Sequence, residues 1–300
     1  MKSRVISLIA SISVAALQSQ PPIIVTSIPK AGTHLLLKAV TLMTKKPNGY
    51  LAPITGQQYT DFNETAAQKV MASKQTSIFA HLHYNTIAAQ ALEKYRFPTL
   101  FIYRDPRDLI LAAARLVRRD LPKRGMPVPA ALGLAKPWPN TYNEYLTKLI
   151  ENVQEIYNNF LPWLQHPMVY AVRFEDLVGT RGGGSAEKQI ETLQGIGRHI
   201  GITLSATEAA QLGSQLFGTS ATFRKGQVGA WKQEMNTAQR KRFCYLHQTL
   251  LEELGYETDD SWVHSLVVEP DRPTSPNRPV APNRPARPNN YPVRPRPITR

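Results

Sequence analysis

Apolar residues in this chain alternate between short β-branched runs and longer stretches with helical spacing. The first run, at residues 23–26, reads Ile-Ile-Val-Thr and predicts a buried strand of a parallel sheet. Directly after it, apolar residues recur at the spacing of one helix face from Leu35 to Met43, and Pro47-Asn48-Gly49 predicts the end of that helix. A strand, a loop and a helix therefore share the segment 23–46.

The same alternation continues along the chain. The pattern predicts further strands at residues 77–80, 99–103 and 168–172, and helices at residues 63–74, 87–95, 109–119 and 188–199. Strands and helices in this order predict an α/β fold of three layers, in which helices cover both faces of a parallel sheet. Ligands of such folds bind beyond the carboxyl ends of the strands, so the residues that follow each strand are candidates for chemistry.

Prolines and glycines interrupt this rhythm at two places. Residues 120–142 hold five prolines, which predicts a loop that is either functional or poorly ordered. Gly182-Gly183-Gly184 predicts a flexible joint between a strand end and the next helix. Further on, Thr237 is expected to cap a helix that runs through Leu254 and ends at Gly255.

The C-terminal segment has a different composition. Prolines fall on every third residue from Pro270 to Pro288, which is the period of a polyproline II helix. Such a disordered, Pro/Arg-rich tail buries no core and serves either as a linker or as an arm that docks on a protein or an acidic surface. We therefore expect a segment 1–20, a domain 21–268 and a flexible tail 269–300.

Charge changes this picture little. The chain of 300 residues has a net charge of +14, of which the tail from residue 270 supplies +6 through seven arginines and Asp271. The remaining charge suits a polyanionic nucleotide substrate as well as a nucleic acid, so there is no strong case for nucleic-acid binding. Cys244 is the single cysteine, which excludes an internal disulfide and fits a reducing compartment.

The N-terminus leaves two alternatives open. Lys2 and Arg4 precede an apolar stretch from Val5 to Leu17, which resembles the core of a signal peptide. The stretch is shorter than the roughly 20 residues that span a bilayer. We expect a helix that packs on a cytoplasmic domain; the alternative is a signal or anchor that makes the protein exported or membrane-associated.

The first strand leads into the strongest local motif, Ser27-Ile28-Pro29-Lys30-Ala31-Gly32-Thr33-His34. Gly32 lets the backbone approach an anion, and the N-terminus of the following helix points N–H groups at it. Lys30 adds a charge and Thr33 a hydroxyl. The segment lacks the GxxxxGK[ST] order of a Walker A loop, and an ordinary strand-to-helix turn is the simpler alternative.

Two further motifs carry cations at strand or loop ends. In Tyr103-Arg104-Asp105-Pro106-Arg107-Asp108, Arg104 is placed to reach a phosphate, and either Asp105 or Asp108 is placed to cap the next helix. In the segment 223–231, Arg224 and Lys225 precede Gly226 in a glycine-flanked loop. Taken alone, these two segments also fit a surface cap and a solvated turn.

Together these segments resemble the sulfotransferase family, over about residues 22–256. The family's PKSGT-like loop is matched by residues 29–33, its R-x-P-x-D pattern by residues 104–108, and its RKGxxGDWK loop by residues 224–232, with Ala230 in place of the aspartate. The family's YEDL segment is matched by residues 174–177, which read Phe-Glu-Asp-Leu.

The resemblance implies a site for 3′-phosphoadenosine 5′-phosphosulfate (PAPS) and no metal. Lys30 would stabilise charge on the departing 5′-phosphate, which the amides from Ala31 through Gly32 to His34 and the Thr33 hydroxyl would hold. The 3′-phosphate would be bound by the side chains of Arg104, Arg224 and Lys225 and by the amide of Gly226. Positions 112 and 174 would also line the nucleotide.

A histidine follows the strand at residues 77–80. In Phe79-Ala80-His81-Leu82-His83, His81 resembles the catalytic base of the family's T-H-L-P segment. A histidine suits proton removal from an acceptor hydroxyl. The alternative is that His81 is a structural histidine, in which case Glu64 or Asp61 is the candidate base. His83 is expected to lie near the acceptor.

Several positions depart from the family pattern. The tryptophan expected after the phosphate loop is Leu35, and the serine expected eight residues after the arginine is Ala112. The YEDL tyrosine is Phe174, which keeps the ring without the hydroxyl, and the lysine two before the histidine is Phe79. These departures put the strength of nucleotide binding in doubt.

Two other functions stay open. A phosphotransferase that uses ATP normally holds Mg²⁺ through a Walker-type Ser or Thr and an acidic strand end; the chain offers Asp105 and Asp176 but no GK[ST] step. A degenerate nucleotide-binding domain that acts as an interaction protein through its basic tail is the other. If the chain is a sulfotransferase, aromatic residues in the segments 48–65 and 120–142 favour an apolar or aromatic alcohol as its small-molecule acceptor.

Overall fold

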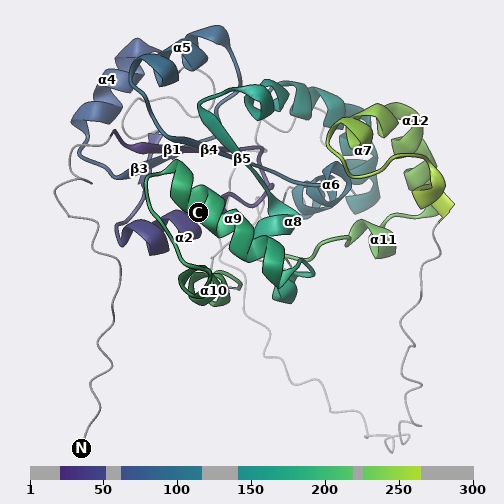
Figure 1. Ribbon diagram of the computed structural model, residues 1–300. Coiled ribbons are helices and arrows are strands. Elements are labelled where there is room, and N and C mark those ends of the chain that lie inside the picture. The colour runs from purple at the N-terminus through teal and green to yellow at the C-terminus, as the bar shows by residue number, and fades with distance from the viewer. Residues whose placement is uncertain (1–20, 52–61, 117–140, 219–225, 265–300) are drawn as a thin grey trace, which may run out of the picture. The chain divides into compact units, whose positions relative to one another are not determined.

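The computed structural model describes residues 21–51, 62–116, 141–218 and 226–264. Within these ranges, parallel strands form one sheet in the order β2-β3-β1-β4-β5 (Figure 1). The strands are β1 (Ile23–Ser27), β2 (Gly49–Tyr50), β3 (Ser77–Ala80), β4 (Thr99–Tyr103) and β5 (Val169–Arg173). The predicted α/β fold with a parallel sheet is confirmed.

Helices connect and cover these strands. The α-helices are α2 (Thr33–Thr44), α4 (Glu64–Ala72), α5 (Thr86–Lys94), α6 (Pro106–Arg115), α7 (Tyr142–Asn158), α8 (Phe174–Leu177), α9 (Ala186–His199), α10 (Ala206–Ser214), α11 (Trp231–Glu234) and α12 (Thr237–Glu253). Short 3₁₀ helices are η4 (Leu161–Gln165), η5 (Thr180–Gly182) and η6 (Ser261–His264).

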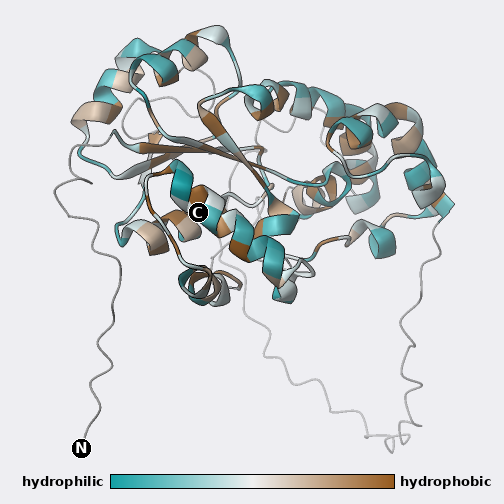
Figure 2. Cartoon of the chain, viewed as in Figure 1, coloured by the Kyte–Doolittle hydropathy of each residue, from teal (hydrophilic) through white to brown (hydrophobic). Residues whose placement is uncertain are grey.

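The strands separate two hydrophobic clusters because successive side chains point to opposite faces of the sheet. In β1, Ile24 packs with α4, α5, α6, α7 and α12 on one face, whereas Ile23 and Val25 pack with α2, α9 and α10 on the other. In β4, Phe101 and Leu100 divide in the same way. Figure 2 shows the strands in brown between helices whose outward sides are largely teal.

The strand order places a topological switch at β1 and β4, which pair in parallel with Val25 beside Leu100. From β1 the chain continues to β2 and β3 on one side, and from β4 it continues to β5 on the other. Ligands of doubly wound folds bind where neighbouring connections diverge in this way. The loops that follow β1 and β4 are therefore the expected place for a ligand.

Helices α7 and α10 and the two-residue strand β2 were not among the predicted elements, and several element ends differ from the prediction. Helix α7 was not predicted, although its buried residues follow helical spacing and Thr141 caps it. Helix α6 begins at Pro106, because Asp105 is its cap. Asn236 rather than Thr237 caps α12, in a capping box with Gln239.

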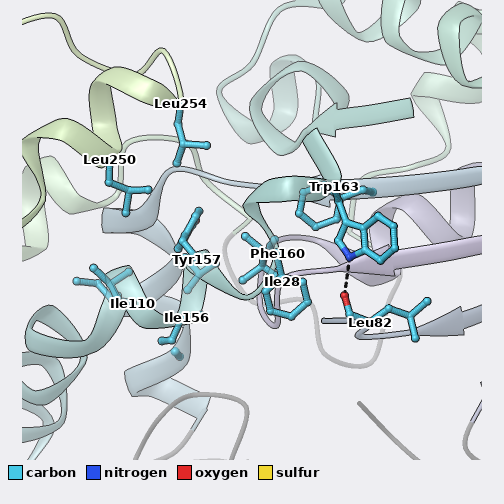
Figure 3. Close-up of a cluster of buried hydrophobic side chains, with 14 of the residues drawn as sticks. Ile28, Leu82, Ile110, Ile156, Tyr157, Phe160, Trp163, Leu250 and Leu254 are labelled. Atoms are coloured by element: carbon cyan, nitrogen blue, oxygen red, sulfur yellow. Dashed lines mark hydrogen bonds between the residues drawn. The ribbon is translucent and has the colours of Figure 1, made fainter. Parts of the chain in front are cut away.

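Aromatic side chains fix the end of β3 to the core under α7 and η4. The Trp163 indole donates a hydrogen bond of 2.9 Å to the carbonyl of Leu82, next to Phe160 and Ile28 (Figure 3). Trp163 and Phe160 are fully buried. The backbone next to the candidate histidine His81 is therefore anchored to the hydrophobic core through Leu82.

Some predictions fall on residues outside the described ranges. They are the N-terminal segment 1–20, most of the proline-interrupted loop 120–142, and the tail from 269. Among the helices in the described part of the chain, none combines the length and the apolar character needed to cross a membrane.

Candidate active site

The loop after β1 contains two residues with positive φ, a backbone conformation that residues other than glycine rarely adopt. Lys30 has φ of +74° and Gly32 of +112°. A Cβ on Gly32 would lie 2.5 Å from Cδ2 of Phe174, so only glycine fits here. No side chain caps the first turn of α2, which begins at Thr33. The N–H groups of that turn are therefore placed to meet an anion, and anion binding by this loop stays a prediction.

A chain of hydrogen bonds joins this loop to the end of β3. The hydroxyls of Ser27 and Thr33 lie 2.6 Å apart, and Nδ1 of His81 lies 3.0 Å from the Ser27 hydroxyl. The same Nδ1 is 2.8 Å from the Ser27 carbonyl oxygen. Because a carbonyl only accepts, Nδ1 carries the proton, and the lone pair of the neutral ring is on Nε2.

His81 is neutral near pH 7. Its burial lowers the pKa to about 4, against a hydrogen bond to the Ser27 carbonyl that acts in the opposite direction. The positive charge of Lys30 adds to the lowering. A neutral imidazole with its lone pair on Nε2 has the protonation state of a general base.

The two residues that follow His81 are fixed by hydrogen bonds and by ring packing. Leu82 donates its N–H to Oγ1 of Thr26 at 2.9 Å, and its carbonyl accepts from Trp163 (Figure 3). His83 packs its ring edge-to-face on Phe160, at 4.9 Å between centroids. Burial lowers the pKa of His83, and its Nε2 is buried without a hydrogen-bond partner among the described residues.

The loop after β4 places Arg104 on the same aromatic ring that packs against the loop after β1. The Arg104 guanidinium lies over the ring of Phe174 at 4.2 Å, and the same ring packs on Gly32. Its Nη2 donates to the Gln227 carbonyl at 2.8 Å, and its Nε is buried with no hydrogen-bond partner in the described ranges. Segments that resemble four family motifs thus meet at one end of the sheet.

Asp108 joins the third predicted loop to this group. Its carboxylate accepts the N–H of Gly229 at 2.8 Å and that of Trp231 at 3.0 Å, and it lies 3.4 Å from Arg104. The sequence suggested Asp105 or Asp108 as a helix cap; the structure assigns the cap to Asp105 alone. Of the predicted residues in this loop, Gly226 is described, with φ of +55°, whereas Arg224 and Lys225 lie outside the described ranges.

Sequence reasoning missed a buried cation next to this loop. Arg107 forms two hydrogen bonds with Asp105 and an ion pair with Glu257. Its guanidinium contacts two indole rings that pack edge-to-face on each other, and lies 3.8 Å from the centroid of Trp231 and 4.5 Å from that of Trp262. Its position three residues after Arg104 was visible in the sequence, but its partners from the C-terminal part of the domain were not.

The remaining predicted residues take several environments. Ala31 is fully buried within the loop after β1, and His34 is exposed in the first turn of α2. Leu35 and Ala112, at the two positions that depart from the family pattern, are both half-buried. Glu64 is exposed at the start of α4, where its ion pair with Lys94 lowers its pKa, and Asp61 lies outside the described ranges.

No group of three or more His, Cys, Asp and Glu side chains gathers to hold a metal ion within the described segments.

Among the comparisons with known proteins, only the comparison with solved structures bears on the fold. No family model matches the sequence, and no curated protein matches it. The crystal structure of mouse sulfotransferase SULT7A1 complexed with PAP matches the fold with a TM-score of 0.53 at 16% sequence identity. The match covers 80% of this chain and 90% of the mouse chain. The chain therefore has a fold that is also found in a sulfotransferase.

Proposed function

We propose that this chain transfers a sulfuryl group from PAPS to a hydroxyl or amine of a small-molecule acceptor. The observation that carries the proposal is the direct contact between segments far apart in the sequence. Gly32 packs on Phe174, Phe174 stacks under Arg104, and Arg104 bonds to the loop that begins at Gly226. Each segment resembles a different donor-binding motif of the family.

In this proposal the donor's two phosphate ends bind to different loops. The first turn of α2 and Lys30 hold the 5′-phosphosulfate, where free N–H groups and a cation favour negative charge. Arg104 holds the 3′-phosphate together with Arg224, Lys225 and the Gly226 amide. The buried Nε of Arg104, which has no protein partner among the described residues, fits a phosphate oxygen as its acceptor.

The acceptor oxygen attacks sulfur, an O–S bond forms, and the bond from sulfur to the 5′-phosphate oxygen breaks. His81 takes the acceptor proton on Nε2, and Lys30 stabilises the charge that develops on the leaving phosphate. The bound donor brings negative charge beside His81, which raises its pKa from the value of about 4 in the free protein toward the neutral range. Donor binding therefore makes His81 a stronger base.

His83 suits a place near the acceptor rather than the donor. It lies two residues after His81, and its ring packs on Phe160 in an apolar setting. An aromatic or apolar alcohol with one polar group fits such surroundings.

The experiment is sulfuryl transfer from PAPS to a panel of phenols and aliphatic alcohols, measured as release of adenosine 3′,5′-bisphosphate (PAP). We expect turnover by the wild type and a loss of about 10²- to 10⁴-fold in His81→Ala with little change in PAP affinity. His199→Ala is the matched control, because His199 is also a half-buried histidine with a lowered pKa, on α9. Equal rates in His81→Ala and the wild type would contradict the proposed base.

A further inference from the structure

The glycine-rich turn at residues 179–184 is packed tightly and is not the flexible joint that the sequence suggested. A Cβ on Gly182 would lie 2.2 Å from Cγ2 of Val178 and 2.8 Å from the carbonyl oxygen of Gly226. A Cβ on Gly184 would lie 2.5 Å from the carbonyl oxygen of Glu175. Real Cβ atoms do not approach so closely, so these glycines allow the turn to press against its neighbours.

Hydrogen bonds join this turn to the loop that begins at Gly226. The N–H of Val228 donates to the Gly182 carbonyl at 2.9 Å, and the side-chain amide of Gln227 donates to the Arg181 carbonyl at 3.1 Å. The turn thus holds the first residues of the loop by their backbone and by one side chain.

Asp108 holds the following residues of the same loop. It is only 2% exposed, and its two carboxylate oxygens accept the N–H groups of Gly229 and Trp231. Arg104 adds a hydrogen bond to the Gln227 carbonyl. Contacts from the glycine turn, from α6 and from the end of β4 therefore fix residues 226–231.

We propose that Gly182 and Asp108 are positioning residues that fix the loop at Gly226 and thereby select nucleotides with a 3′-phosphate. This inference rests on the proposed function, in which the Gly226 amide and the two preceding cations bind that phosphate. A backbone amide recognises phosphate oxygen only within a narrow range of distance and angle, so a displaced loop loses the 3′-phosphate contacts first. The 5′-phosphate contacts, on the loop after β1, stay in place.

The test compares binding of PAP and of adenosine 5′-monophosphate (AMP), which differ only in the 3′-phosphate. In Gly182→Ala the added methyl group meets the Gly226 carbonyl. In Asp108→Asn one carboxylate oxygen becomes an amide nitrogen, which cannot accept, so the N–H of either Gly229 or Trp231 loses its acceptor. Gly183→Ala is the control, because it strains the same turn at φ of +83° while its Cβ meets Val228 at an ordinary 3.6 Å.

We expect Gly182→Ala and Asp108→Asn each to reduce the ratio of PAP to AMP affinity by about tenfold or more, since each disturbs charge-assisted contacts to phosphate. AMP affinity stays near that of the wild type, and Gly183→Ala keeps the wild-type ratio. An unchanged ratio, or an equal loss of PAP and AMP affinity, overturns the inference. If one variant does not fold by circular dichroism, the other decides alone.

The failure of the proposed function is recognised separately. If the wild type itself binds PAP no better than AMP, the chain has no 3′-phosphate site for Gly182 and Asp108 to position. If the wild type prefers PAP and both variants keep that preference, the site stands and the positioning role does not.

Discussion

Arg107 offers a test of how this part of the fold is stabilised. The residue is 1% exposed, and its guanidinium contacts the rings of both Trp231 and Trp262. It forms hydrogen bonds of 3.0 and 2.8 Å with Asp105 and an ion pair of 2.7 Å with Glu257. The substitution Arg107→Met keeps an apolar side chain against the two indoles and removes the charge.

The expected loss follows from the burial of Asp105. That carboxylate is 5% exposed, so removing Arg107 leaves a buried charge without its partner, which costs about 3–5 kcal/mol. For a domain of this size each kcal/mol corresponds to a change of roughly 2–4 °C, so Tm should fall by about 10 °C. Loss of the two cation–π contacts acts in the same direction.

The control is a pair with the same chemistry on the surface. Arg242 donates to both oxygens of Glu151 at 2.8 and 2.7 Å, but the two side chains are 48% and 38% exposed. Arg242→Met should therefore cost less than about 1 kcal/mol. Both variants are compared with the wild type by urea denaturation. Equal losses in free energy of unfolding for the two variants would refute the argument from burial.

Three further predictions concern the loop after β1 and the histidine. His81→Asn keeps a donor for the Ser27 carbonyl and removes the titration. Because the folded pKa of about 4 lies below the unfolded value near 6.5, the stability that neutral His81 confers is complete above pH 6.5 and is lost as the pH falls toward 4. Between these pH values, urea denaturation should show the wild type losing about 3 kcal/mol more than His81→Asn; parallel curves would contradict the lowered pKa. In transfer assays, the acid limb of kcat/KM for PAPS, which reports the free enzyme, should lie near pH 4 and that of kcat at a higher pH, since bound donor raises the pKa of His81; a limb at 6.5 in kcat/KM for PAPS would argue against His81. Gly32→Ala places a methyl group 2.5 Å from Phe174 at φ of +112°, and should cost about 2–4 kcal/mol of stability and weaken donor binding; a variant as stable and as tight-binding as the wild type would show that the loop adapts.

The sequence predicted the strands of this fold well because they are continuous apolar runs followed by turn residues. β3 and β4 have the predicted bounds, β1 and β5 differ from the prediction by one residue at their ends, and the two-residue strand β2 was not predicted. The order of the strands depends on contacts between distant segments, which no local pattern contains. Helix α7 was missed for a different reason. Its apolar residues have helical spacing, but the helix directly follows a proline-rich stretch that predicts a loop.

For the candidate site too, the sequence predicted the local motifs but not the contacts between distant segments. The glycine at 32 and the cations at 30 and 104 were predicted from local motifs, and their roles in catalysis and binding remain proposals. The contact of His81 with Ser27 spans 54 residues and that of Asp108 with Gly229 spans 121. Such partnerships are set by the sheet order and by packing, so the sequence could indicate the residue types but not which atoms meet.

The central claim is a binding site for a nucleotide with a 3′-phosphate. The most direct measurement is equilibrium binding of PAP and of ADP to the wild type and to Lys225→Ala. The account predicts strong preference of the wild type for PAP and loss of that preference in the variant. Equal affinity for the two nucleotides, or binding of neither, would contradict the sulfotransferase proposal and favour a degenerate nucleotide-binding domain that acts through its basic tail.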